Sequence, residues 1–317
     1  MSPLAKKPTT TRSELDNKAP LKSLVEENLK STELERGIHF FGDQHKVRVA
    51  NRLELRQKAY EYVYKVYLNE GYIKNENSKL QLTIYSALPD TTTLYAEDHD
   101  GNLSGTFTMV FDSGIGLPSD LQYKNEIDKL RCGKRRICEI ISFGIDKTQR
   151  GSVKILAGLF YCSYLLAWHV MASTDFIINV IPSQADFYCN NLLFRKIGNI
   201  KKCPRTNGIP AVLLNLPLCL SRKLRKKMRV FPFSMLKYSE QDEIKLARKL
   251  KRMLLPMSDL EFYTFFIENT DLWEKASDKQ KDYIKKLYTV DQADHLSISR
   301  ALAKTVSKNY QNQNDNP

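Results

Sequence analysis

The sequence predicts an α/β or α+β fold in which a mixed sheet carries helices on both faces. Short apolar runs with a period of two alternate along the chain with stretches of helical period. Apolar residues make up 42% of the 317 residues, which is enough for one sizeable core. Strands and helices that alternate in this way bury their apolar faces by layering helices on a sheet.

The first expected element is an amphipathic helix that follows a polar tail. Residues 1–45 are poor in apolar side chains and mixed in charge, so we expect them to be disordered. Asn51 and Glu54 have the spacing of a helix cap and its partner, and Gly71 is a stop signal. Tyr60, Tyr64 and Tyr67 lie between the cap and Gly71 and share one helical face. This face either packs in the core or lines an acyl channel.

Alternating apolar patterns predict the strands. The two strands that flank residues 98–102 form a hairpin, because the loop has Asp-Gly turn chemistry. Ser119 and Gln122 have the spacing of a capping box for a helix over 120–130, and a later short helix carries Tyr188. Strands are expected at 80–88, 93–97, 103–111, 137–145, 175–181, 194–202 and 211–216.

The run 155–172 is apolar enough to raise the question of a membrane span. Its 18 residues carry no formal charge apart from His169, whereas a spanning helix needs about 20 apolar residues. Ser173 leads almost directly into an apolar strand. We therefore expect a helix over 153–172 that is buried against the sheet.

The charge of the chain points to an acidic partner. The net charge is +13, and residues 221–252 hold 12 Lys and Arg against 3 Asp and Glu. We expect a boundary near residue 220 and a basic helical extension over 221–317. No nucleic-acid motif accompanies the charge, which disfavours nucleic acid as the partner. A non-enzymatic basic protein that binds nucleic acid or an anionic membrane surface is the alternative interpretation.

The six cysteines form no CxxC pair and lack His-rich ligand spacing. The sequence therefore predicts reduced thiols and no metal site. The N-terminal residues also lack the apolar core of a signal peptide. These features predict a cytoplasmic protein, with peripheral membrane association as a further option.

Two side chains have the chemistry of proton transfer. Glu139 lies on a strand whose same face carries Ile141, so desolvation should raise its pKa and let it take a proton from an ammonium group. The alternative is an ion pair with Arg135, Arg136 or another cation. Tyr188 can donate a proton to a leaving thiolate, and the alternative is a tyrosine of the core.

In these stretches the chain resembles the long-chain N-acyl amino acid synthases of the FeeM type, which are GNAT-fold relatives of the acyl-homoserine-lactone synthases. The resemblance implies a GNAT-like domain over 46–220 and an amino acid as the acceptor. It also implies that the donor is an acyl-phosphopantetheine thioester on an acidic acyl carrier protein, with no permanently bound cofactor. The similar stretches are AYEYVYKVYLNEGYI (59–73), GTFTMVFDSGIGLPSD (105–120), CEIISF (138–143), Arg150, 182–198 and NGIPAVLLNLP (207–217).

The resemblance also implies roles for single residues. It places Glu139 at the family's strand glutamate, Tyr188 beside the thioester sulfur, and Arg150 near the pantetheine phosphate. Backbone N–H groups at the start of the following helix would add phosphate contacts through Gly151 and Ser152. The remaining candidates for substrate contacts are Arg135, Arg136, Tyr64 and Tyr67.

Two residues depart from the family's pattern. Gln184 stands where the family often has His, which puts a proton relay there in doubt. Val153 stands where the GNAT coenzyme A loop has its first glycine, which argues against coenzyme A as the preferred donor.

The basic extension is the candidate docking surface for the carrier protein. Opposite potentials raise the rate of encounter more than they deepen binding. The alternative is a solvated helix face without a partner. The candidate docking residues are Arg222, Lys223, Arg225, Lys226, Lys227 and Arg229.

Overall fold

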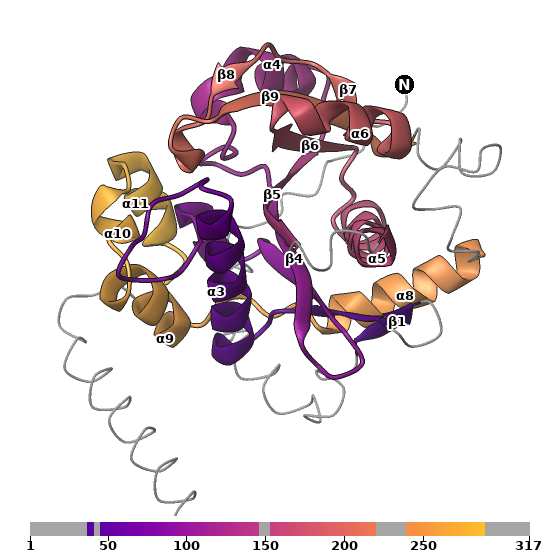
Figure 1. The fold of residues 1–317 in the computed structure, drawn as a ribbon, viewed down its shortest axis with the longest axis horizontal. Coiled ribbons are helices and arrows are strands. Elements are labelled where there is room, and N and C mark those ends of the chain that lie inside the picture. The colour runs from indigo at the N-terminus through magenta and orange to yellow at the C-terminus, as the bar shows by residue number, and fades with distance from the viewer. Residues whose placement is uncertain (1–36, 41–44, 146–152, 220–238, 289–317) are drawn as a thin grey trace, which may run out of the picture. The chain divides into compact units, whose positions relative to one another are not determined.

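The computed structural model describes residues 37–40, 45–145, 153–219 and 239–288. All of them belong to one compact unit, Gly37–Pro317. Nine strands form a sheet in the order β1-β2-β3-β4-β5-β6-β9-β7, with β8 paired to β9 (Figure 1). The strands are β1 Ile38–Phe40, β2 His45–Val49, β3 Thr92–Glu97, β4 Leu103–Phe111, β5 Ile137–Ile145, β6 Asp175–Val180, β7 Arg195–Lys196, β8 Lys201–Lys202 and β9 Pro210–Pro217.

Helices cover both faces of this sheet and divide the core in two. On one face, α3 (Leu53–Asn69) and α4 (Asp120–Cys132) enclose a cluster that includes Tyr60 and Tyr123. On the other face, α5 (Val153–Tyr164) and α6 (Pro182–Leu192) enclose a second cluster. Figure 1 shows α3 and α5 on opposite sides of β4 and β5. The predicted mixed sheet with helices on both faces is confirmed.

The sheet opens between β5 and β6. Among the described pairings this one is parallel and the others are antiparallel. It ends at Ile140 opposite Ile178, although both strands continue beyond these residues. Next, β5 bulges against β4 at Ser142, whose φ of 52° lies in the left-handed region. A bulge bends its strand and increases the local twist. The two strands therefore separate and leave a wedge in the sheet.

The predicted buried helix is confirmed. It is formed by α5 and its π-helical continuation, η3 (Leu165–Val170). Leu159 of α5 and Leu165 of η3 are fully buried. Within the described residues, no helix combines the length and the apolar character needed to cross a bilayer.

The described part of the basic extension is helical and packs against both clusters. Ala247 and Leu250 of α8 join the cluster around α5, whereas Phe262 and Phe265 join the cluster around α3. A buried ion pair between Arg56 of α3 and Glu261 also links the extension to the sheet domain. The elements are α8 Glu240–Arg252, α9 Asp259–Phe262, η6 Tyr263–Glu268, α10 Leu272–Lys275 and α11 Asp278–Ile284.

Three predicted elements were wrong in type or extent. The strand predicted over 194–202 is two short strands, β7 and β8, which pair separately with β9. The run 80–88 is an extended segment followed by the 3₁₀ helix η1 (Ile84–Ala87), because its apolar side chains pack in the cluster around α3 and none of the described strands pairs with it. Strand β1 lies inside the predicted tail, because Ile38 fills the core and is 2% exposed. Residues 1–36 and 41–44 of that tail lie outside the described residues.

Two predicted helix caps make tertiary contacts instead. The cap of α3 is Arg52, and Asn51 donates through Nδ2 to the carbonyl of Met253 at 2.9 Å. Ser119 is the N-cap residue of α4, as predicted, but its side chain makes no capping hydrogen bond and donates to Glu139 instead. The predicted turn of the β3–β4 hairpin is confirmed, because Asp98 accepts hydrogen bonds there from its own loop.

Candidate active site

A cavity of about 410 Å³ lies at the wedge between β5 and β6. Val66 and Tyr67 of α3 line it, and so do Leu156 and Phe160 of α5. Because α3 and α5 lie on opposite faces of the sheet, the cavity passes through the wedge. Enclosed, mostly apolar cavities with a few polar groups are typical ligand sites.

The two parts of the cavity differ in chemistry. On the side of α5 and α6 the lining is aromatic and aliphatic, and Phe160 packs on Tyr188 with ring centroids 6.4 Å apart. The loop before β9 and the strand end of β6 add polar groups from Arg205, Thr206 and Asn179. Among the described lining residues, Arg205 is the one with a formal charge.

Tyr188, the candidate proton donor, and Tyr67, the candidate channel residue, both line the cavity. Tyr188 is 6% exposed, and burial, followed by the nearby Tyr67 and Tyr72, raises the pKa of its phenol well above the ordinary value. Burial raises the pKa of Tyr67 to about 12. Tyr188 therefore keeps its proton throughout the neutral range.

Glu139 is fully buried on β5 beside this cavity, and three donors surround its carboxyl group. The Ser119 backbone N–H donates to Oε2 at 2.8 Å, and the Ser119 hydroxyl donates to Oε1 at 2.6 Å. Arg205 donates from Nη2 to Oε1 at 3.2 Å. Burial raises the pKa of Glu139 above its ordinary value, while Arg205 and Ser119 partly oppose the shift. The cation that pairs with Glu139 is thus Arg205, rather than Arg135 or Arg136.

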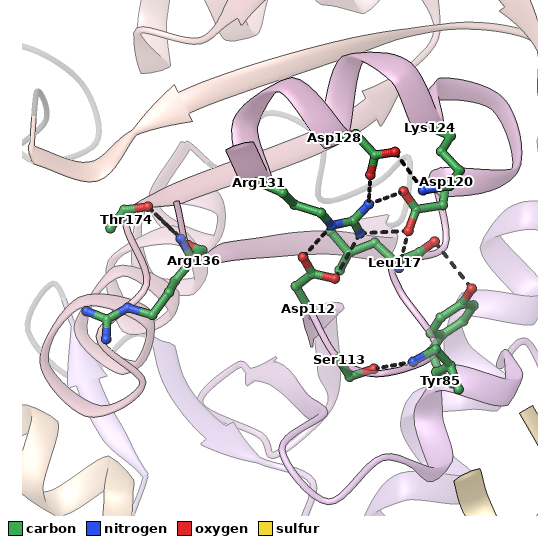
Figure 2. A network of polar contacts seen from close by, with 11 residues as sticks. Tyr85, Asp112, Ser113, Leu117, Asp120, Lys124, Asp128, Arg131, Arg136 and Thr174 are labelled. Atoms are coloured by element: carbon green, nitrogen blue, oxygen red, sulfur yellow. Dashed lines mark hydrogen bonds and ion pairs between the residues drawn. The ribbon is translucent and has the colours of Figure 1, made fainter. Parts of the chain in front are cut away.

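The loop that presents Ser119 is held by an ion-pair network around Arg131, which Figure 2 shows. Arg131 of α4 pairs with Asp112, Asp120 and Asp128, with the closest approach to each at 2.7 Å. Asp120 also accepts the backbone N–H of Leu117 at 2.7 Å. The carboxylates raise the pKa of the Arg131 guanidinium. The network ties both ends of the segment between β4 and α4, and Ser119 lies at its end.

Other predicted site residues lie elsewhere. Tyr64 is buried, and its hydroxyl donates to the Asn75 side chain at 2.6 Å, away from the cavity lining. Arg135 and Arg136 line a second, open pocket of about 700 Å³ at the start of β5. There Arg135 pairs with the buried Asp175 at 2.8 Å. The structure therefore does not bring these three residues to the cavity, and their substrate contacts stay predictions.

Two predicted groups lie outside the described residues. One is the phosphate-binding turn of Arg150, Gly151 and Ser152, which directly precedes α5. The other is the basic run proposed for carrier docking, from Arg222 to Arg229. All six cysteines are described, and each is a free thiol.

Three residues of the site escaped the sequence reasoning. Arg205 sits in a polar loop, 66 positions from Glu139, and nothing local distinguishes it from other surface arginines. Ser119 was assigned to a helix cap. Asn179 is a polar residue near the end of the apolar strand β6. A polar residue in that position is the one signal that could have identified it from the sequence.

Comparisons with known proteins agree with this architecture. A family model described as N-acyl amino acid synthase FeeM matches residues 58–217. The solved structure of FeeM, an N-acyl amino acid synthase from uncultured soil microbes, has a TM-score of 0.50 and 23% identity, covering 61% of this chain and 98% of that one. Its similarity shows the shared GNAT-like fold.

Weaker structural similarities extend to other acyltransferases. The AHL synthase LasI gives a TM-score of 0.37 at 20% identity, covering 55% of this chain and 90% of that one. A variant of the spermidine N-acetyltransferase SpeG from Vibrio cholerae gives 0.39 at 12% identity, covering 57% and 98%. No curated protein sequence matches the chain.

Proposed function

Because this chain belongs to the FeeM family of N-acyl amino acid synthases, it is an N-acyltransferase, and we propose that it moves a long-chain fatty acyl group from an acyl carrier protein thioester to the amine of an amino acid. The cavity that crosses the sheet is the observation that carries the proposal. Its apolar wall of Leu156, Phe160 and Tyr188 suits an acyl chain. Its polar wall around Arg205 suits a small charged acceptor.

The wedge also suits a phosphopantetheine arm. Beyond Ile140 and Ile178, the facing edges of β5 and β6 no longer pair with each other. Backbone groups of such edges hydrogen-bond an extended ligand in the way that an added strand would. The donor would thus place its thioester between the acyl wall and the acceptor wall without any resident cofactor.

The reaction forms one bond and breaks one. The acceptor ammonium first loses a proton, and the free amine then attacks the thioester carbonyl carbon. Collapse of the tetrahedral intermediate breaks the C–S bond, and the nitrogen loses a second proton, which replaces the one given to sulfur; the products are the amide and the carrier thiol. In this proposal Glu139 takes the proton from the amine, directly or through a bridging water, and Tyr188 protonates the departing sulfur.

The direct test uses purified protein, long-chain acyl carrier protein and the proteinogenic amino acids. We expect amide products in the mass spectrum, together with an equal amount of free carrier thiol. Coenzyme A thioesters of the same acyl chain should be poorer donors. If no amide forms with any amino acid, the proposed acceptor class is wrong. Because carrier proteins and free amino acids meet in the cytoplasm, we propose that the protein acts there, with the basic extension available for contact with a membrane surface.

A further inference from the structure

We infer that Arg205 binds the α-carboxylate of the acceptor and thereby makes the enzyme select amino acids over other amines. The inference rests on the proposed function and goes further by assigning the group that recognises the acceptor. Arg205 supplies the formal charge of the described cavity lining. A carboxylate that enters a mostly apolar cavity needs such a partner, because an unpaired buried charge is costly.

The guanidinium of Arg205 is held in place yet has capacity left. One hydrogen bond, from Nη2 to Glu139, joins it to the described residues. Arginine has five N–H donors in a planar fork, so the remaining donors can bind a second carboxylate in bidentate fashion. The side chain is 22% exposed, so a cavity ligand can reach it, whereas Glu139 is fully buried. Glu139, which Ser119 holds in place, thus fixes the fork on its buried side.

A second feature of the cavity suits the acceptor's amine. Asn179 follows Ile178, the last residue of β6 that pairs with β5, and lines the cavity at the mouth of the wedge. Its Nδ2 donates to Oε1 of Gln122 at 2.8 Å, and Gln122 donates from Nε2 to the Lys202 carbonyl. This chain of donors leaves Asn179 Oδ1 as a buried acceptor with no partner among the described residues.

The two features together define an amino acid subsite. A primary ammonium has three N–H donors, one of which can bind Asn179 Oδ1. The carboxylate of the same molecule binds Arg205. An α-amino acid carries both groups on one carbon, whereas a simple amine carries only the first. The subsite therefore explains selection for amino acids through two separable contacts.

The test compares the best amino acid acceptor of the wild-type protein with its own α-carboxamide, using long-chain acyl carrier protein as the donor. Arg205→Gln should raise KM for the amino acid about 10- to 100-fold, which is about 1.4–2.8 kcal/mol, because the acceptor carboxylate loses its charged partner. KM for the carboxamide should change little. Arg205→Lys keeps the charge but loses the fork, so its effect should be intermediate.

Two further variants make the result decisive. Arg195→Gln removes an exposed arginine of β7 that does not line the cavity, so it should leave both KM values unchanged. Asn179→Leu should raise KM for the amino acid and the carboxamide alike, because both carry the amine. An equal loss of both acceptors in Arg205→Gln protein that still unfolds cooperatively would overturn the inference while leaving the proposed function intact. Absence of any amide from the wild-type protein would instead overturn the proposed function.

Discussion

Burial raises the pKa of the Glu139 carboxyl group, whereas its partners Arg205 and Ser119 lower it, so the titration of Glu139 shows which of the two effects is larger. The net shift of this pKa in the folded protein is upward. A raised pKa means that the folded state holds the proton more tightly than the unfolded chain does. The stabilisation from Glu139 is therefore complete below the unfolded pKa of about 4.3 and is lost as the pH rises through the folded pKa.

Replacing Glu139 by Gln should expose this dependence. The free energy of unfolding of the wild type minus that of Glu139→Gln should fall between pH 4 and pH 8, by about 1.4 kcal/mol for each unit by which the pKa is raised. Urea denaturation across that pH range measures the difference. A difference that grows with pH would mean that the ion pair with Arg205 outweighs burial.

The same substitution tests the proposed base. Glu139→Gln should lower kcat at neutral pH about 100- to 10,000-fold, which is the usual cost of losing a general base. Tyr188→Phe should cost less, because a thiolate with a pKa of about 8.5 is already a competent leaving group. Rates of carrier thiol release, in protein shown to be folded by circular dichroism, provide the measurement. A larger loss in Tyr188→Phe would reverse the two roles.

At this scale the sequence predicted residue types better than residue partners. Glu139 was identified because a carboxylate on an apolar strand face is conspicuous on its own. Its partners were missed because Ser119 fits a capping pattern and Arg205 lies 66 positions away. A local pattern contains no information about which distant loop folds over a buried carboxyl group.

Among the elements, the segment between β4 and α4 is the one that the Arg131 network controls. Figure 2 shows Arg131 between the carboxylates of Asp112, at the start of the segment, and Asp120, at its end. Gly116 has a φ of 79°, and a Cβ there would meet Asp120 Oδ2 at 2.3 Å. The segment can therefore approach Asp120 only with glycine at this position.

Arg131→Ala should destabilise the protein by about 2–4 kcal/mol, because it leaves three carboxylates close together without their cation. Lysine at this position should recover part of the loss, since it cannot bind two carboxylates bidentately. Lys124→Ala is the matched control. Among the described residues Lys124 pairs with Asp128 alone, at the exposed end of the network, and its loss should cost no more than about 1 kcal/mol. Denaturant unfolding of the three variants checks the order. Equal losses for Arg131→Ala and Lys124→Ala would contradict the proposed anchoring.

Most strands and the long buried helix could be predicted from periodicity, whereas the wedge could not. Apolar alternation identifies β5 and β6 separately. The point where their pairing stops depends on the bulge of β5 at Ser142 and on the pairing of β6 with β9 along its other edge. Both are tertiary effects. The run 80–88 shows the converse, since its alternation reflects burial under a helix rather than strand pairing.

At the scale of the whole molecule, the C-terminal helices contribute buried side chains to both core clusters. Phe265 packs edge-on against Tyr60 of α3 at 5.2 Å between ring centroids, and Asn51 and Arg56 bind the backbone of residues 253 and 255. The family match ends at residue 217, so these contacts lie beyond the part of the chain that it covers. The described part of the basic segment 222–252 is therefore α8, which packs into the core through Ala247 and Leu250.

The exposed basic side chains of α8 bear on the proposed docking of the acyl carrier protein. On α8, Lys245, Arg248 and Lys251 are exposed. An acidic carrier would be steered towards the segment 222–252 by its summed field. Steering acts on encounter, so it should alter the apparent KM for carrier-bound donor and leave the chemical step alone.

Reversing Arg225, Lys226 and Lys227 to Glu should therefore raise KM for acyl carrier protein and leave turnover of a short pantetheine thioester nearly unchanged, since that donor has no acidic surface. The control reverses Lys279, Lys285 and Lys286, which are exposed in and after α11, and makes the same change of net charge elsewhere on the molecule. The wild-type rate with carrier protein should also fall steeply with salt, because the Debye length shrinks from about 10 Å at 0.1 M to about 3 Å at 1 M. If the control triple raises KM equally, net charge rather than this segment drives the encounter. If both donors lose turnover equally, the segment supports the fold, and the carrier docks elsewhere.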